Sequence, residues 1–140
     1  SFMEEYTMST ELRWGILATG GIARSFTRDI LDAGHSVTAV GSRAPGAAQA
    51  FATEFGIPTA HGSYEQLAAD PDVDVIYVAT PHPMHLEGAL LAIEGGKHVL
   101  VEKPFALNAA QAAQIAQAAS AAGVVAMEAM WTRFLPHIVR

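Results

Sequence analysis

Short apolar runs alternate with amphipathic or Ala-rich stretches along most of the chain. The apolar runs predict six strands, at residues 12–17, 36–40, 59–60, 73–78, 98–101 and 124–127. Four of the stretches between them predict helices at residues 22–31, 47–55, 86–94 and 109–122, and a fifth, shorter helix is predicted between its cap Ser63 and Pro71. Glycines, for example Gly34 and Gly56, stop most of these helices.

Strands that alternate with helices at this spacing need right-handed crossovers and a parallel sheet covered on both faces. We therefore predict an α/β fold: a three-layer αβα Rossmann fold with a doubly wound, mainly parallel sheet. Residues 11–135 would form this domain. Residues 1–10, which lack the pattern of an export signal, are expected to be a leader outside it, and residues 136–140 to begin a C-terminal portion with a helix after Pro136.

Four chemically distinctive segments follow predicted strands. They are residues 17–23, 41–43, 80–85 and 102–104. Because the carboxyl ends of parallel strands share one edge of an open sheet, these segments are expected to converge on one crevice.

The first turn reads Ala18-x-Gly20-x-x-Ala23, which resembles the dinucleotide fingerprint G-x-G-x-x-G/A. Gly20 would let the backbone approach a pyrophosphate, and the amides at the helix start would face it. Ala18 replaces the first glycine, which costs about 1–2 kcal/mol if φ is positive there and nothing if φ is negative. The alternative is a Gly-rich turn without a ligand. Ala23 is small enough for the helix to pack on the strand, and the predicted cofactor-binding residues of this turn are Ala18, Thr19, Gly20, Gly21, Ile22 and Ala23.

The second predicted strand ends in Gly41-Ser42-Arg43, where NAD-binding versions of the fold carry an acidic residue. Ser42 can donate a hydrogen bond to the extra phosphate of NADP, and Arg43 can form a charge-assisted pair with it. These residues favour NADP over NAD. The alternative is that Arg43 is a solvated residue at the start of a helix.

Glu102-Lys103-Pro104 follows an apolar strand, where two opposite charges have no packing reason to occur. Pro104 disfavours the helical conformation for Lys103, which would hold the lysine at the mouth of the crevice. An ordinary surface ion pair is the alternative.

Composition narrows the class of protein. The 140 residues are 51% hydrophobic, enough for one core, and contain no cysteine, which excludes disulfides and thiolate sites and fits a cytoplasmic location. The net charge of -6 argues against a nucleic-acid or membrane partner.

Together these motifs resemble the glucose-fructose oxidoreductase / inositol dehydrogenase family, and most of all its dihydrodiol dehydrogenase-like branch. The resemblance rests on residues 14–23, Thr80-Pro81-x-x-x-His85, Glu102-Lys103-Pro104 and residues 128–134, and it covers the chain from residue 12 onward. It implies that Lys103 is the catalytic residue, contacting both the nicotinamide and the substrate hydroxyl. The other residues that it implies at the cofactor are Thr80, Pro81, His82, His85, Glu102, Trp131 and Arg133.

Some of these assignments have alternatives. The family usually has Asn where this chain has His82, so the contact there is open. His82 and His85 could share a metal, but no third ligand converges with them and no metal is expected. Trp131 and Arg133 could instead be core and rim residues.

The resemblance implies an NADP(H)-dependent oxidoreductase, with NAD also possible, acting on a secondary alcohol or carbonyl of a sugar, cyclic polyol or diol. Family members continue into a second α/β domain that covers the substrate and mediates assembly. This polypeptide alone is therefore expected to bind the nucleotide without turning over. A non-catalytic dinucleotide sensor of the same fold is one alternative, and a ligand-free interaction module is another.

Overall fold

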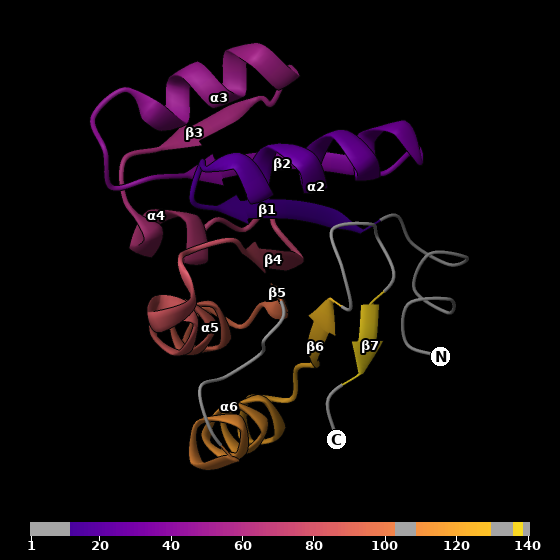
Figure 1. The fold of residues 1–140 in the computed structure, drawn as a ribbon, viewed down its shortest axis with the longest axis vertical. Helices are drawn as coiled ribbons and strands as arrows, with labels where there is room; N and C mark the ends of the chain where they lie inside the picture. Colours follow the sequence, from indigo (N-terminus) through magenta and orange to yellow (C-terminus); the bar gives the residue numbers. More distant parts are fainter. Residues whose placement is uncertain (1–11, 103–108, 130–135, 139–140) are drawn as a thin grey trace.

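The computed structural model describes residues 12–102, 109–129 and 136–138 (Figure 1). Within these residues seven strands form one sheet, in the order β3-β2-β1-β4-β5-β6-β7. β1 to β6 pair in parallel, whereas β7 pairs antiparallel with β6. The strands are β1 (Arg13–Leu17), β2 (Ser36–Gly41), β3 (Thr59–His61), β4 (Val75–Val78), β5 (His98–Glu102), β6 (Ala126–Ala129) and β7 (Pro136–Ile138).

Helices separate the strands, and together they form the outer layers of a three-layer α/β domain, as predicted. The ribbon shows β3 and α3 at one end of the molecule and α6, β6 and β7 at the other (Figure 1). The helices are α2 (Gly21–Asp32), α3 (Ala47–Phe55), α4 (Tyr64–Ala68), α5 (His85–Glu94) and α6 (Ala109–Ala122), and a 3-10 turn, η1 (His82–Met84), precedes α5. No helix in the described ranges has both the length and the apolar character that crossing a bilayer requires.

Residues 136–138 differ from the expectation. They form strand β7, in which Pro136 is the register partner of Ala129, so the helix expected after Pro136 is wrong for these residues. The domain boundary at residue 135 stays a prediction.

The core lies on both faces of the central strands, which explains why β1, β4 and β5 read as continuous apolar runs. On the α2 side, Phe26 stacks on Tyr77 with ring centroids 3.8 Å apart, and Trp14 meets Phe26 edge-on at 5.4 Å. This aromatic cluster attaches α2 to β1 and β4, and so fixes the start of α2 above the ends of these strands.

An ion pair between Arg13 and Asp74 connects β1 with the start of β4 at their amino ends. The Arg13 guanidinium donates to both carboxylate oxygens of Asp74, Nε to Oδ2 at 2.9 Å and Nη2 to Oδ1 at 3.0 Å. Burial opposes ionisation of Asp74, but the hydrogen bonds and charge of Arg13 outweigh burial and lower the pKa of this carboxyl group. This ion pair helps to set the register of β1 and β4, and the opposite ends of these two strands form the crevice.

Candidate functional site

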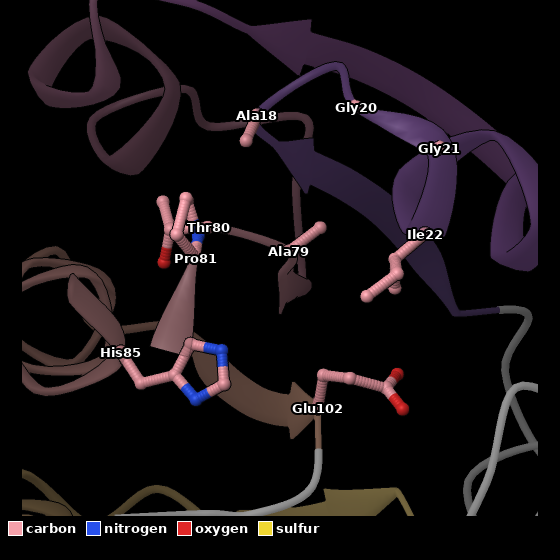
Figure 2. Close-up of a pocket in the computed structure, with 9 residues that line it drawn as sticks. All are labelled: Ala18, Gly20, Gly21, Ile22, Ala79, Thr80, Pro81, His85 and Glu102. Atoms are coloured by element: carbon pink, nitrogen blue, oxygen red, sulfur yellow. The ribbon is translucent and has the colours of Figure 1, made fainter. Parts of the chain in front are cut away.

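The carboxyl ends of β1, β4 and β5 surround a pocket of about 310 Å³. β1 and β4 are neighbours although β2 and β3 lie between them in sequence, so the pocket opens where the direction of chain winding reverses. The residues that line it are Ala18, Gly20, Gly21, Ile22, Ala79, Thr80, Pro81, His85 and Glu102 (Figure 2). Apart from Ala79, all were predicted from sequence as site residues.

Ala18 has a positive φ of +92°, the conformation for which the fingerprint uses glycine. Its amide donates to the Gly41 carbonyl at 2.9 Å, so the β1 turn is tied to the end of β2. The sequence left the sign of this φ open, and the structure shows the strained case.

Gly20 and Gly21 leave the space above the turn open. A Cβ built at either position would meet no heavy atom of the described part of the chain within 4 Å. Gly20 caps α2 with φ −76°, a value open to any residue, and α2 has no side-chain cap and no acidic residue in its first turn. Protein packing and backbone conformation therefore do not require glycine at position 20, whereas a ligand lying close over the backbone would.

The end of β4 contributes Thr80 and Pro81. Thr80 is 4% exposed, and its hydroxyl oxygen has no hydrogen-bond partner among the described residues. The Met84 amide donates to the Pro81 carbonyl at 2.8 Å, which closes the turn that leads into α5. A buried hydroxyl of this kind is a ready donor or acceptor for a polar ligand group.

Glu102 ends β5 and is almost fully buried on the pocket wall. The Tyr77 hydroxyl donates a short hydrogen bond to Oε2 of Glu102. Burial, this hydrogen bond and the nearby carboxylate all raise the pKa of Tyr77, so the phenol stays protonated and remains the donor. His85 begins α5 and is also buried against the pocket.

A second hollow, of about 230 Å³, lies beside the end of β2, next to the start of α3. Of the two predicted NADP-selecting residues, Arg43 lines this hollow and Ser42 does not. Ser42 is buried and its hydroxyl accepts a hydrogen bond from the Ala44 amide at 3.1 Å, so it shapes the turn. Arg43 lines the hollow with residues of the following turn and of β3.

The Arg43 guanidinium is held on two sides. Its carbon atom lies 4.8 Å from the centre of the Tyr64 ring, and Nη2 donates to Oε1 of Glu87 at 3.0 Å. Sequence reasoning missed Tyr64 and Glu87, because only the fold brings α4 and α5 to the end of β2. These contacts favour one orientation for a side chain that is still half exposed.

Several predicted site residues do not line the two hollows. Ala23 is fully buried and packs in the core, as expected for a small residue between helix and strand, and Thr19 lies in the turn beside the pocket. Lys103, Trp131 and Arg133 lie outside the described residues, as does the His82 side chain. Within the described part of the chain, no group of three or more His, Asp or Glu side chains could hold a metal.

The parallel sheet with its reversal point, the open glycine turn and the pocket beyond it define the chain as an NAD(P)-binding Rossmann domain. Comparison with known families agrees: residues 12–130 match the family described as "Oxidoreductase family, NAD-binding Rossmann fold". The chain belongs to this family, the glucose-fructose oxidoreductase / inositol dehydrogenase family.

Curated relatives include trans-1,2-dihydrobenzene-1,2-diol dehydrogenase from Mus musculus, 47% identical over 128 residues, covering 89% of this chain and 38% of the relative. A D-xylose 1-dehydrogenase (NADP(+)) from Hypocrea jecorina is 45% identical, with 89% and 35% covered. The resemblance to the dihydrodiol dehydrogenase-like branch is thus confirmed. The chain spans little more than a third of the length of these relatives.

Solved structures share the fold. An NAD binding oxidoreductase from Klebsiella pneumoniae superimposes with a TM-score of 0.80 at 32% identity, covering 86% of this chain and 34% of that one. A 3-ketoreductase from Actinomadura kijaniata, solved with NADP and TDP-benzene, gives a TM-score of 0.74 at 32% identity, covering 85% and 37%.

Proposed function

We propose that this chain is the cofactor-binding part of an NADP(H)-dependent oxidoreductase. The intact enzyme would transfer a hydride between nicotinamide and a secondary alcohol or carbonyl of a sugar, cyclic polyol or diol. The observation that carries the proposal is the open space over Gly20 and Gly21, which no atom of the described residues fills and which leads directly into the pocket. The names of the dihydrodiol and D-xylose dehydrogenase relatives support the substrate class.

The residues of the first turn fit a dinucleotide. The amides that begin α2 would bind the pyrophosphate, since the first N–H groups of a helix have no acceptor within it. Gly20 would give the phosphates access to the backbone, and the pocket between Ile22 and Glu102 would hold the nicotinamide. The buried Thr80 hydroxyl would gain there the partner that it lacks among the described residues.

Preference for NADP would come from Arg43. A guanidinium already placed by Tyr64 and Glu87 loses less freedom when it pairs with a phosphate, and a charge-assisted bond is worth about 1.5–3 kcal/mol. The NADP named for two relatives is in line with this preference.

Catalysis would depend on Lys103, which follows the wall residue Glu102. Bound cofactor supplies the hydride acceptor or donor, and the chain must accept or return the proton of the substrate hydroxyl. A lysine with an ordinary pKa near 10.4 is almost entirely protonated at neutral pH and so cannot accept a proton, but a nearby positive charge would lower the pKa and raise the share of the neutral amine, which can. In the intact enzyme, Lys103→Met should abolish most turnover while the cofactor still binds. Turnover within a few-fold of the original would contradict this role of Lys103.

The binding proposal is tested by titrating the purified chain with NADPH and NADH while cofactor fluorescence is followed. We expect NADPH to bind at least tenfold more tightly than NADH. Equal affinities would contradict the preference for NADP but would leave the proposed binding of a nicotinamide dinucleotide standing. Binding of neither nucleotide would contradict the proposed function and favour a ligand-free interaction module.

A further inference from the structure

Glu102 is the one carboxylate among the described residues that line the pocket. It is 7% exposed, and its neighbours around the cavity, among the described residues, are apolar groups, the Thr80 hydroxyl and the imidazole of His85. A charge surrounded in this way is weakly screened by water, so it acts strongly on any charge that enters the cavity. Figure 2 shows the Glu102 side chain on the far side of the pocket from the Ala18 turn.

Tyr77 fixes the position of this carboxylate. Tyr77 pairs in register with Leu100, and Glu102 lies two residues further along β5, so both side chains belong to the α2 face of the sheet. The phenol donates to Oε2 of Glu102 from a ring that is itself stacked on Phe26 at 13° between planes. Because the ring is packed and its hydroxyl donates to the carboxylate, which can only accept, the carboxylate is held in one orientation.

The two forms of a nicotinamide dinucleotide differ chiefly at the ring, which carries a positive charge when oxidised and none when reduced. Ribose, phosphates and adenine are the same in both forms. A fixed negative charge at the ring pocket therefore acts on the difference between the forms, and contacts elsewhere act on both alike.

We propose that Glu102, positioned by Tyr77, makes this pocket favour the oxidised cofactor over the reduced cofactor. Glu102 is the charged group that acts on the ring, and Tyr77 is a positioning residue that acts through it. The inference rests on the proposed function, since it needs the nicotinamide in this pocket. It adds a selection for redox state, which would favour NADP⁺ as the form resting in the site before an alcohol is oxidised.

The test measures dissociation constants of NADP⁺ and NADPH for three forms of the whole chain: wild type, Glu102→Gln and Tyr77→Phe. NADPH is followed by fluorescence, and NADP⁺ by its competition with NADPH. We expect Glu102→Gln to weaken NADP⁺ binding about tenfold relative to NADPH, because the amide keeps the shape and removes the charge. Tyr77→Phe keeps the ring stack, removes the donor, and should shift the same ratio in the same direction by a smaller factor.

A purely structural role would change both affinities together and leave their ratio unchanged. Glu102→Asp, which keeps the charge, should keep the ratio nearer to the wild-type value than Glu102→Gln does. If Glu102→Gln does not fold, the ratio for Tyr77→Phe decides. A ratio within twofold of wild type in the folded variants would overturn this inference and leave the proposed function standing, whereas a wild-type chain that binds neither form would overturn both.

Discussion

Ala18 is the one described residue other than glycine that has a positive φ, and it occupies the first glycine position of the fingerprint. The left-handed region costs an alanine about 1–2 kcal/mol, because its Cβ crowds the following carbonyl oxygen. The strain persists because the amide of Ala18 is tied to the Gly41 carbonyl on the neighbouring strand. The turn therefore keeps the shape of a dinucleotide site without the residue that adopts it most easily.

Ala18→Gly is expected to raise the free energy of unfolding by about 0.5–1 kcal/mol. Relief of strain in the folded chain should add about 1–2 kcal/mol to the free energy of unfolding. The larger conformational freedom of glycine in the unfolded chain should subtract about 0.5–1 kcal/mol from it. Urea unfolding measures the change. The control is Ala113→Gly on the exposed face of α6, which should cost about 1 kcal/mol. A loss at position 18 as large as the loss at position 113 would contradict the strain argument.

Arg43 is the residue on which cofactor choice depends. Arg43→Ala is expected to weaken NADPH binding about ten- to a hundredfold and to change NADH binding little, because only NADPH carries the phosphate that the guanidinium would meet. Glu87→Gln should strengthen NADPH binding a few-fold, since the amide oxygen can still accept from Arg43 and hold it in place while the negative charge that competes with the phosphate is lost. Fluorescence titration of both cofactors measures these effects. Equal losses for the two cofactors in Arg43→Ala would show that Arg43 does not contact the phosphate.

At the scale of elements, the sequence predicted the α-helices and the parallel strands of the described residues to within two residues at each end. Local chemistry made this possible. The Ser63 hydroxyl accepts from the Gln66 amide at 3.1 Å, the expected cap of α4, and Gly56 ends α3 with a φ of +70°. Signals of this kind are carried by residues close together in sequence, so they can be read without the fold.

Strand β6 shows where local reading fails. It was predicted to start at Val124 but starts at Ala126. The Val124 amide donates to the Ala119 carbonyl and so still closes α6, and the Val125 amide donates to Nδ1 of His98 on β5. A side chain from another strand takes the place of the ladder bond, and nothing in residues 124–129 predicts it.

This contact makes part of the stability depend on pH. As an acceptor, Nδ1 of His98 must be unprotonated, and burial lowers the pKa of His98 although Asp74 partly opposes the shift. The contribution is fully present above the ordinary histidine pKa of about 6.5. It is lost as the pH falls below this value toward the folded-state pKa of His98. In this range His98 binds a proton in the unfolded chain but not in the folded chain.

His98→Asn should remove this part of the pH dependence, since the amide oxygen can still accept from Val125 but does not titrate. Urea unfolding of both proteins at pH 7.5 and pH 5.5 gives the comparison. We expect the wild type to lose more stability than the variant on acidification, by no more than about 1.4 kcal/mol per pH unit. Parallel losses in the two proteins would contradict the assigned role of His98.

At the scale of the whole molecule, the sequence predicted correctly that three of the four segments after strands meet at one pocket, whereas Arg43 of the fourth segment lines a separate hollow. Alternating elements imply a parallel sheet, and a parallel sheet brings the residues after β1, β4 and β5 to one edge. Side-chain partners could not be predicted in this way. Tyr64 and Glu87 reach Arg43, and Tyr77 reaches Glu102, across separations that only the folded sheet closes.

Substitutions at two glycines can distinguish an effect on ligand binding from an effect on folding. A Cβ at Gly20 would meet none of the described residues, whereas a Cβ at Gly95 would lie 2.2 Å from the Ala68 carbonyl oxygen, where α4 and α5 meet. The same substitution, glycine to alanine, is therefore expected to have a different consequence at each position. Gly20→Ala should affect the cofactor, and Gly95→Ala should affect the fold.

The most direct test is NADPH titration of wild type, Gly20→Ala and Gly95→Ala, with the free energy of unfolding measured for each. We expect Gly20→Ala to lose at least tenfold in NADPH affinity while its stability stays within about 1 kcal/mol of wild type. Gly95→Ala should lose more than 1 kcal/mol of stability, and its folded fraction should bind NADPH with wild-type affinity. Unchanged NADPH affinity in a folded Gly20→Ala protein would contradict the claim that a dinucleotide lies over this turn.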